Sequence, residues 1–333
     1  MAAKVAINGM GRIGRATFKV VLDTPELELA AVNDLVSIQN LAYLLKYDTV
    51  YGRYGKKVES TPDSLIVDGK EYKVFNQKDP AALPWKDLGV DLAFECTGVF
   101  TDQQGLEKHI QAGARYAILS APDKKGTMDT VVHGVNQPGE SASVFSCASC
   151  TTNCITPVVE VMGRRIGIKK AIMTTIHAYT SSQAIVDTPA GKFRRGRAGA
   201  ANFVPTSTGG AIATTKALPQ YKGKFDGVAI RGPVPIGSLA DLVFITEKPV
   251  SPDQINDFFR EEAQSDRYNG IMGVSEDEIV SADIIMDPRA SIVDLTMTQV
   301  VDGDLVKIMS WYDNEWGYSN QMVREALATI RRG

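Results

Sequence analysis

The chain has 333 residues, of which 44% are hydrophobic and 23% are charged, and its formal net charge at pH 7 is -3. This length supports two domains with full cores, and the composition is that of an ordinary globular protein. The charge argues against a general nucleic-acid or membrane surface, and no apolar run is long enough to cross a bilayer. Three of the four cysteines fall within eight positions and no signal-peptide pattern is present, so we expect a cytoplasmic protein.

The first 120 residues alternate predicted strands with predicted helices. Strands are expected at residues 4–8, 29–33, 91–96 and 116–119, and helices at residues 12–22, 38–46 and 101–112. Such alternation indicates βαβ units and a parallel sheet. Residues 65–74 break the pattern, because Asp68-Gly69 between two β-rich runs predicts a hairpin inserted into the sheet.

The pattern changes after about residue 146. A helix is predicted from Cys150, and Pro157 inside it is expected to kink it or to confine its regular part. Residues 179–202 have no clear periodicity, which is typical of a functional or disordered loop. Longer strands are expected at residues 169–177, 228–231, 239–246, 291–300 and 305–311, and helices at residues 253–263 and 317–332. This half predicts an α+β domain on a mostly antiparallel sheet.

A glycine-rich turn follows the first predicted strand and opens the first predicted helix. In Gly9-Met10-Gly11-Arg12-Ile13-Gly14, Gly9 permits a tight turn, Gly11 lets the backbone approach a pyrophosphate, and Gly14 lets the helix pack on the strand. Asp34 ends the second strand, where its carboxylate can accept hydrogen bonds from ribose hydroxyls and repel a 2'-phosphate. This context favours a dinucleotide site, and NAD over NADP, rather than a turn whose glycines serve packing alone.

Cys150 is the candidate nucleophile, because it begins a predicted helix between the hydroxyl residues Ser149 and Thr151. A helix N-terminus lowers the pKa of a thiol and stabilises the reactive thiolate. His177 closes a predicted strand and is by position the best base to activate this thiol.

The other histidines and cysteines have weaker claims. We place His109 in a surface helix and His133 in a strand of the first domain. Cys96 and Cys154 are expected to be small core residues, whereas the role of Cys147 stays open. The cysteine spacing lacks a second ligand cluster, so no metal site is expected.

Characteristic motifs occur along most of the chain. They are GMGRIG at 9–14, Asn33-Asp34, LAYLLKYDTVYGR at 41–53, ASCTTNC at 148–154, HAYT at 177–180, residues 194–197 and 205–209, and WYDNEWGYSN at 311–320. Together these motifs resemble the glyceraldehyde-3-phosphate dehydrogenase family, and the similarity extends from about residue 4 to residue 331. ASCTTNC combined with WYDNEWGYSN is highly specific to this family and its sugar-phosphate relatives.

The resemblance implies a Rossmann-type, doubly wound parallel sheet in a dinucleotide-binding domain of residues 1–149, on which a C-terminal helix of residues 315–333 packs. A catalytic α+β domain would occupy residues 150–314. The implied reaction is the NAD-dependent oxidative phosphorylation of glyceraldehyde 3-phosphate to 1,3-bisphosphoglycerate through a cysteine thioester, in glycolysis and gluconeogenesis. The implied assembly is a cytoplasmic homotetramer whose partners are this substrate and inorganic phosphate, with no nucleic acid, membrane or metal.

The resemblance also assigns roles to single residues, with Cys150 as the nucleophile and His177 as its base. The cofactor-binding residues would be Gly9, Gly11, Arg12, Ile13, Gly14, Asp34, Lys78, Ser120 and Asn314. The incoming phosphate would be bound by Ser149, Thr151, Thr208 and Gly209, and the substrate phosphate by Thr180, Arg195 and Arg231.

Two departures from the family pattern keep alternatives open. Thr188 stands where a NAD-type enzyme usually has Leu, which points weakly toward NADP. The run after Arg231 is also unusual, so a dehydrogenase of erythrose 4-phosphate remains the alternative within this chemistry. A non-catalytic RNA-binding or interaction protein on this fold should have a broken Cys/His/Arg set, and here the set is intact. A thiol hydrolase would leave the glycine-rich turn and Asp34 unexplained.

Overall fold

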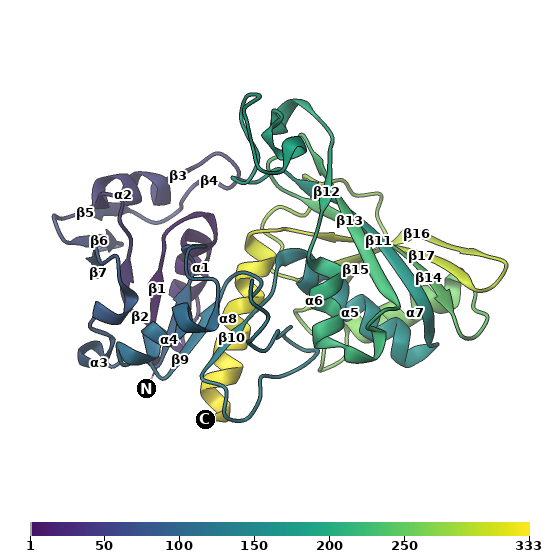
Figure 1. The fold of residues 1–333 in the computed structure, drawn as a ribbon, viewed down its shortest axis with the longest axis horizontal. Helices are drawn as coiled ribbons and strands as arrows, with labels where there is room; N and C mark the ends of the chain where they lie inside the picture. Colours follow the sequence, from purple (N-terminus) through teal and green to yellow (C-terminus); the bar gives the residue numbers. More distant parts are fainter. Residues whose placement is uncertain (1) are drawn as a thin grey trace. The chain divides into compact units, whose positions relative to one another are not determined.

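The computed structural model describes residues 2–333 (Figure 1). Contacts within the chain separate two compact units. The first unit takes the chain up to Val131 together with Gln137–Ala148 and Met322–Gly333, and the second comprises Val132–Asn136 and Ser149–Gln321. Each unit has its own sheet.

The sheet of the first unit has the strand order β10-β9-β8-β1-β2-β7-β6-β5. Its strands are β1 (Ala3–Asn8), β2 (Leu27–Asn33), β5 (Val58–Ser60), β6 (Ser64–Val67), β7 (Lys70–Phe75), β8 (Leu92–Glu95), β9 (Tyr116–Leu119) and β10 (Val144–Ser146). All pairs from β10 to β7 are parallel, whereas β6 pairs antiparallel with both β7 and β5. The predicted parallel sheet is confirmed, and the predicted hairpin lies at its edge.

The hairpin turn has the geometry that its sequence predicts. Asp68 has a φ of 47° and Gly69 a φ of 80°, and both angles are positive, as a type I' turn requires. The Asp-Gly pair tolerates these angles, and the turn therefore sets the register in which Val67 pairs with Lys70.

The helices of the first unit pack against this sheet. They are α1 (Arg12–Leu22), α2 (Ile38–Lys46), α3 (Trp85–Leu88) and α4 (Gln103–Gln111), with the 3-10 turn η1 (Pro80–Ala82); β3 (Tyr47–Asp48) and β4 (Gly52–Arg53) form a separate short ladder. The amphipathic α1 buries Phe18 and Val21, while α4 packs on β9 and β10. His109 on α4 is fully buried, so its predicted place on the surface is wrong.

The sheet of the second unit has the order β12-β13-β11-β14-β17-β16-β15. Its strands are β11 (Ile168–Ala178), β12 (Val204–Ser207), β13 (Phe225–Gly232), β14 (Ser238–Thr246), β15 (Met272–Ser275), β16 (Ser291–Val301) and β17 (Leu305–Tyr312). The β11–β13 and β15–β16 pairs are parallel and the others antiparallel, as the sequence predicts for most of this sheet. Residues of β14 alternate between buried and half-buried positions, so one face of the sheet packs on the core.

Helices α5 (Cys150–Arg165), α6 (Gly210–Ala217) and α7 (Pro252–Ala263) pack with this sheet, with the 3-10 turn η4 (Pro219–Tyr221) after α6. Pro157 does not confine the regular part of α5, which continues to Arg165. The helix is buried on both sides of the proline, and the packing of residues such as Val158 and Met162 offsets the backbone hydrogen bond that proline cannot donate.

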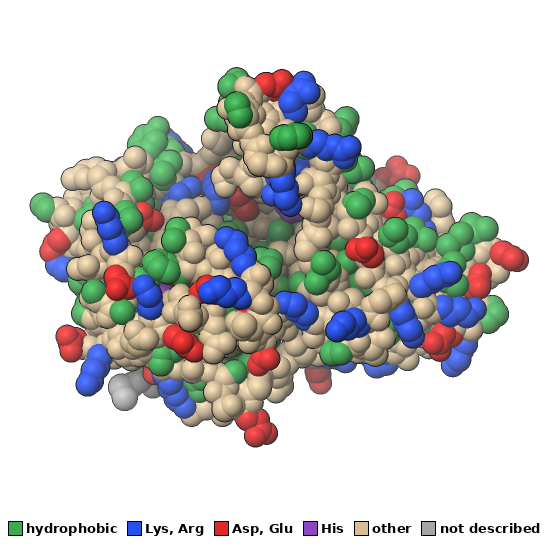
Figure 2. Space-filling model, viewed as in Figure 1, with side chains coloured by type: hydrophobic (Ala, Val, Ile, Leu, Met, Phe, Trp, Pro, Cys, Tyr) green, Lys and Arg blue, Asp and Glu red, His purple; other side chains and the backbone are tan. Residues whose placement is uncertain are grey.

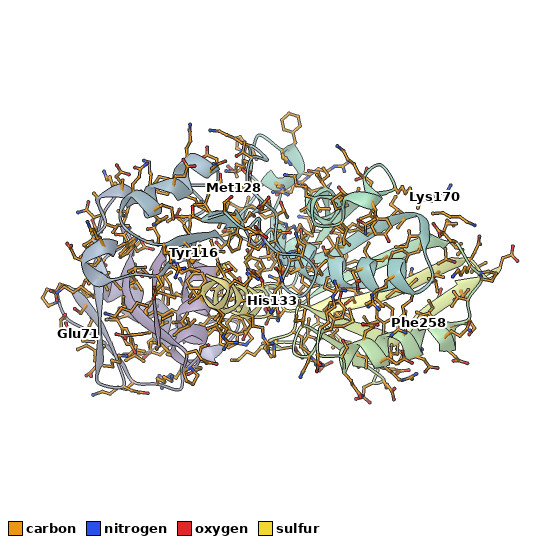
Figure 3. All side chains as sticks on the ribbon, turned by 90° about the horizontal axis from the view of Figure 1, so that it is seen from below. Glu71, Tyr116, Met128, His133, Lys170 and Phe258 are labelled. Carbon is orange, nitrogen blue, oxygen red and sulfur yellow. The ribbon has the colours of Figure 1, made fainter. Side chains whose placement is uncertain are left out.

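Two further segments differ from simple expectation. Residues 179–202 contain the 3-10 turns η2 (Phe193–Gly196) and η3 (Gly199–Ala201) and are joined by backbone hydrogen bonds, such as Thr188 N–H to the Gly196 carbonyl. His133 lies in a turn of the second unit and not in a strand (Figure 3).

The last helix, α8 (Trp316–Arg332), begins in the second unit and ends in the first.

Gly11, the N-cap of α1, and Gly14, in the first turn of that helix, allow a matched test of packing. An added Cβ at Gly14 would overlap the Gly9 carbonyl oxygen, whereas one at Gly11, whose φ is -66°, would meet nothing within 4 Å. We expect Gly14→Ala to lower the free energy of unfolding by about 1–3 kcal/mol, as overpacking does. Gly11→Ala should change it by less than about 0.5 kcal/mol. Urea unfolding followed by circular dichroism measures both, and equal stabilities would contradict the close approach at Gly14.

Candidate active site

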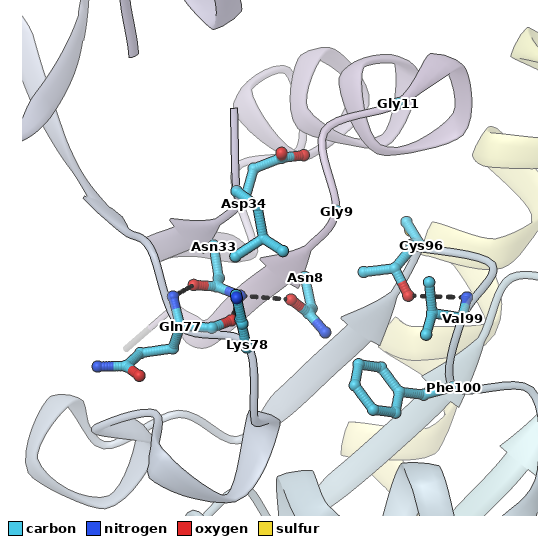
Figure 4. A pocket seen from close by; sticks show the side chains of 12 residues that line it. Asn8, Gly9, Gly11, Asn33, Asp34, Gln77, Lys78, Cys96, Val99 and Phe100 are labelled. Carbon is cyan, nitrogen blue, oxygen red and sulfur yellow. Dashed lines mark hydrogen bonds between the residues drawn. The ribbon is translucent and has the colours of Figure 1, made fainter. Parts of the chain in front are cut away.

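A pocket of about 320 Å³ lies in the first unit, where β1, β2 and β8 end (Figure 4). In a parallel sheet of this type, ligands bind outside the carboxyl ends of the strands. The lining residues are Asn8, Gly9, Gly11, Asn33, Asp34, Leu35, Gln77, Lys78, Cys96, Thr97, Val99 and Phe100.

The glycine-rich turn forms one side of this pocket. Gly9 has a φ of +93°, and an added Cβ would lie 2.7 Å from the Thr97 nitrogen, so only glycine fits there. At Gly11, the N-cap of α1, an added Cβ would meet open space. This open space at the start of a helix suits the phosphates of a dinucleotide, because the helix N-terminus presents N–H groups and a favourable dipole.

Asp34 faces the same pocket with its carboxylate held in place. Its Oδ2 accepts a hydrogen bond from the Met10 N–H at 2.6 Å, and its Oδ1 accepts one from the Val36 N–H at 2.9 Å. Each carboxylate oxygen can accept more than one hydrogen bond, so these contacts orient Asp34 and leave acceptor capacity for ribose hydroxyls.

The pocket brings together only some of the cofactor-binding residues that the sequence predicts. Gly9, Gly11, Asp34 and Lys78 line it, whereas Arg12, Ile13, Gly14 and Ser120 are not among its lining residues. Arg12 pairs with Asp48 at 2.5 Å and lies over the ring of Tyr51.

Sequence reasoning missed other lining residues, including Asn8, Gln77, Thr97 and Phe100. A polar residue such as Asn8 at the carboxyl end of a predicted parallel strand is the signal that could have identified part of this set.

In the second unit, Cys150 and His177 form a hydrogen-bonded pair. Cys150 is the first residue of α5, whose N-cap Ser149 accepts the Thr152 N–H at 3.2 Å. His177 lies near the end of β11 and is 4% exposed. The distance from Cys150 Sγ to His177 Nε2 is 3.3 Å, so a proton can pass directly between the two atoms.

The electrostatics of this pair differ from the sequence expectation. Burial raises the pKa of the Cys150 thiol, while the Arg231 guanidinium and hydrogen bonds from Thr151 act in the opposite direction. Burial and then the Arg231 cation lower the pKa of His177 to about 3, against the Ala178 carbonyl, which raises it. The expected net lowering of the Cys150 pKa is therefore wrong for the chain alone, because burial outweighs the Arg231 cation and the hydrogen bonds from Thr151.

Arg231 lies against this pair, because β13 pairs with β11 in a register that puts Arg231 opposite His177. Its Nη1 is 2.7 Å from His177 Nδ1 and donates to the Ala178 carbonyl at 2.9 Å. Within residues 2–333, the buried Arg231 Nε has no hydrogen-bond partner. A half-buried guanidinium with an unused buried donor suits a phosphate or carboxylate, since charge-assisted hydrogen bonds are the strong ones.

The starts of α5 and α6 meet beside Thr151. An added Cβ on Gly210 would lie 2.9 Å from Thr151 Cγ2. Thr208 Oγ1 accepts the Gly210 N–H at 3.1 Å, which places Thr208 and Gly209 at the beginning of α6. Two helix N-termini side by side favour a bound anion.

The remaining predicted ligands also lie in the second unit. Arg195 Nε donates to Thr206 Oγ1 at 3.1 Å, and the Arg195 charge is among the causes that lower the pKa of His177. The Thr180 and Ser182 hydroxyls are hydrogen-bonded at 2.9 Å. Asn314 is buried, and its Oδ1 accepts a hydrogen bond from Ser238 Oγ at 3.0 Å.

Tyr312 is a neighbour of the Cys150–His177 pair that sequence reasoning did not single out. Its ring meets the His177 ring edge to face, with centroids 5.9 Å apart. Its hydroxyl is hydrogen-bonded to the Thr151 hydroxyl at 3.0 Å and to the Thr175 hydroxyl at 2.8 Å. Tyr312 therefore fixes the ring and the helix start that flank Cys150.

Residues 2–333 contain no cluster of histidine, cysteine or acidic side chains suited to a metal ion. No helix in that range has the length and apolar character that a membrane span needs.

Comparisons with known proteins identify both parts of the chain. Residues 3–103 match the family model described as "Glyceraldehyde 3-phosphate dehydrogenase, NAD binding domain", and residues 149–314 match "Glyceraldehyde 3-phosphate dehydrogenase, C-terminal domain". The chain is 47% identical over 327 residues to "Glyceraldehyde-3-phosphate dehydrogenase" of Streptomyces coelicolor, with 97% of each chain covered. It is 44% identical over 336 residues to "Glyceraldehyde-3-phosphate dehydrogenase 1" of Bacillus subtilis, with 100% of each covered.

A third relative, "Glyceraldehyde-3-phosphate dehydrogenase" of Thermotoga maritima, is 48% identical over 325 residues, with 96% of this chain and 97% of the relative covered. These names do not favour the erythrose 4-phosphate or RNA-binding alternatives. The chain therefore belongs to the glyceraldehyde 3-phosphate dehydrogenase family and is an NAD-dependent dehydrogenase.

Proposed function

We propose that this chain oxidises glyceraldehyde 3-phosphate and phosphorylates the product to 1,3-bisphosphoglycerate through a thioester on Cys150, in glycolysis and gluconeogenesis. The observation that carries this proposal is the 3.3 Å contact between Cys150 and His177 beside the half-buried guanidinium of Arg231. A thiol with a base at this distance can form an acyl intermediate, and the cation suits a phosphorylated aldehyde.

The residues of the second unit divide the chemistry between them. His177 Nε2 takes the thiol proton as Cys150 Sγ attacks the aldehyde carbon, which gives a hemithioacetal. NAD, when bound, supplies the acceptor for the hydride whose loss turns this hemithioacetal into a thioester. Phosphate oxygen then attacks the thioester carbon, the carbon–sulfur bond breaks, and the acyl phosphate leaves Cys150 as a thiolate. The Cys150 N–H can stabilise the oxyanion.

The two phosphates would occupy separate sites in this unit. Arg231, Arg195 and Thr180 would bind the phosphate of the substrate, and the electrostatic effect of both arginines on His177 supports their nearness to the reacting atoms. The incoming phosphate would lie at the starts of α5 and α6. Its ligands would be Ser149, Thr151, Thr208 and Gly209.

The pocket of the first unit fits NAD, because the Asp34 carboxylate faces it and Gly11 leaves room beside the start of α1. We assign residues 1–149, with the C-terminal helix, to the dinucleotide-binding domain and residues 150–314 to the catalytic domain. The cofactor-binding residues would be Gly9, Gly11, Arg12, Ile13, Gly14, Asp34, Lys78, Ser120 and Asn314.

We further propose that the protein works in the cytoplasm as a homotetramer that takes up inorganic phosphate. Large apolar side chains are exposed in and after the segment 179–202, where Ile185 is 89%, Phe193 88% and Phe203 72% exposed. Figure 2 shows green side chains on the projecting segment at its top. Such a concentration of exposed apolar side chains supports burial against another copy.

The nucleophile is tested by Cys150→Ser. We expect this variant to lose NADH formation with glyceraldehyde 3-phosphate, phosphate and NAD, because a serine hydroxyl stays protonated at this helix start. Absorbance at 340 nm follows the reaction, and NAD binding should persist. The matched control is Cys154→Ala, which changes a fully buried thiol one turn further along α5 and should keep most of the turnover. Wild-type turnover by Cys150→Ser would refute the thioester mechanism.

The substrate phosphate site is tested by Arg231→Ala. Loss of a charge-assisted hydrogen bond worth roughly 1.5–3 kcal/mol should raise KM for the aldehyde phosphate about ten- to a hundredfold, with a much smaller effect on KM for NAD. Arg260→Ala removes an exposed arginine paired with Glu276 and should change neither constant. Equal rises in both constants for Arg231→Ala would count against a phosphate-binding role.

Cofactor choice is tested by Asp34→Ala. The carboxylate that Met10 and Val36 hold in the pocket should accept ribose hydroxyls and repel a 2'-phosphate, so the wild type should have the higher kcat/KM with NAD. Asp34→Ala should raise KM for NAD and lower the ratio of kcat/KM with NAD to kcat/KM with NADP by about tenfold. Steady-state kinetics with both cofactors measure this, and an unchanged ratio would show that Asp34 does not select the cofactor.

A further inference from the structure

Three buried polar residues end three neighbouring strands beneath the pocket of the first unit. Glu95 ends β8, Asn8 ends β1 and Asn33 ends β2, and the register pairs Asn8 with both of the others. Their exposed fractions are 0%, 1% and 3%. Asn8 and Asn33 line the pocket, whereas Glu95 does not.

Hydrogen bonds connect these side chains in one direction. Asn8 Nδ2 donates to Glu95 Oε2 at 2.6 Å, and Asn33 Nδ2 donates to Asn8 Oδ1 at 2.8 Å. The Asn33 side chain is also hydrogen-bonded to the backbone of Gln77, since it accepts from the N–H at 2.8 Å and donates to the carbonyl at 2.9 Å (Figure 4). The Gln77 N–H can only donate and its carbonyl can only accept, so they fix which way the Asn33 amide faces. Asn33 in turn orients Asn8, whose NH2 group finds its acceptor in Glu95.

Glu95 also holds the opposite wall of the pocket. Its Oε1 accepts hydrogen bonds from both the N–H and the hydroxyl of Thr97, and that hydroxyl in turn accepts the Val99 N–H at 3.1 Å. One carboxylate therefore links the wall at Thr97 and Val99 with the wall at Gln77, which precedes the lining residue Lys78.

The orientation of Glu95 is fixed from the side away from the pocket by His109 and Trp85. Trp85 Nε1 donates to His109 Nδ1 at 3.0 Å, and an indole N–H can only donate. The ring proton of His109 must then lie on Nε2, which donates to Glu95 Oε2 at 3.0 Å. Both aromatic residues are fully buried, and their rings stack with centroids 6.5 Å apart.

We propose that Glu95 is a positioning residue for NAD, which sets both walls of the nucleotide pocket through Asn8, Asn33 and Thr97 without touching the cofactor. This inference rests on NAD binding in the pocket and not on the chemistry at Cys150. With the Glu95 carboxylate in place, the amides of Asn8 and Asn33 both have acceptors. Such satisfied networks of buried polar groups rigidify the backbone around them. A pocket fixed in this way before NAD arrives costs less free energy to order on binding.

Glu95→Gln tests the proposal with almost no change in shape. The new NH2 group would face either the donors of Asn8 and His109 or those of Thr97, so donors on one side of residue 95 lose their acceptor. We expect NAD to bind about tenfold more weakly to the variant, measured by isothermal titration calorimetry without substrate. Its KM for the aldehyde phosphate should stay within twofold of the wild type, because those ligands belong to the second unit.

Glu262→Gln is the matched control, since Glu262 is a buried carboxylate of the second unit held by Arg164 and Arg165. It should bind NAD as the wild type does, even if its melting temperature falls. Equal weakening of NAD binding in both variants, or a Glu95→Gln protein that melts normally and binds NAD within twofold of wild type, would overturn the proposal.

Asn8→Ala provides a second measurement, also usable if Glu95→Gln does not fold. It removes the hydrogen bonds that join Glu95 to Asn33 but leaves the contacts of Glu95 with His109 and Thr97. We expect it to weaken NAD binding about as much as Glu95→Gln does. Since Glu95 acts partly through Asn8, the double variant should lose less affinity than the product of the two single losses. If the double variant lost the full product of the two single losses, or if Asn8→Ala bound NAD with wild-type affinity, the hydrogen-bonded side chains of Glu95, Asn8 and Asn33 would not position the cofactor. If experiments refuted the thioester mechanism at Cys150, the NAD affinities expected for these variants would stay the same.

Discussion

The 3.3 Å contact between Cys150 and His177 depends on two elements that meet in the core of the second unit. Cys150 starts α5, whose own buried residues, such as Val158 and Met162, keep it regular through Pro157. His177 lies on β11, which is paired on both sides by β13 and β14. The same register brings Arg231 to His177, so the cation and the base are placed by one strand pairing.

Burial gives this pair its chemical character. It raises the pKa of Cys150 and lowers that of His177, so the uncharged thiol and imidazole are the stable forms in the chain alone. Charge separation between them must therefore be supported by groups that act during the reaction. The N-terminus of α5 and Arg231 favour the thiolate, while Arg231 opposes a charged His177. A phosphate bound to Arg231 would reduce that opposition.

Local patterns in the sequence predict most of the fold. The strand–glycine turn–helix arrangement predicts α1 and the pocket beside Gly11, and the Asp68-Gly69 pair predicts the hairpin turn, because both depend on a few adjacent residues. The position of Cys150 at a helix start also follows from neighbouring residues. The burial of His109 could not be predicted, because its acceptor Glu95 and donor Trp85 come from other elements. The same holds for the raised pKa of Cys150, which depends on the packing of the whole second unit.

Helix α8 belongs to both units, since the division falls between Gln321 and Met322. The first unit therefore needs residues from the very end of the chain, including the buried Val323 and Ala326. During synthesis a ribosome produces most of this unit first, but its last helical segment emerges after the entire second unit. Domains commonly fold as they leave the ribosome, beginning with the N-terminal one. Here the N-terminal unit cannot complete its packing until residues 322–333 have been made, so a nascent chain must carry an unfinished nucleotide domain throughout the synthesis of the second unit.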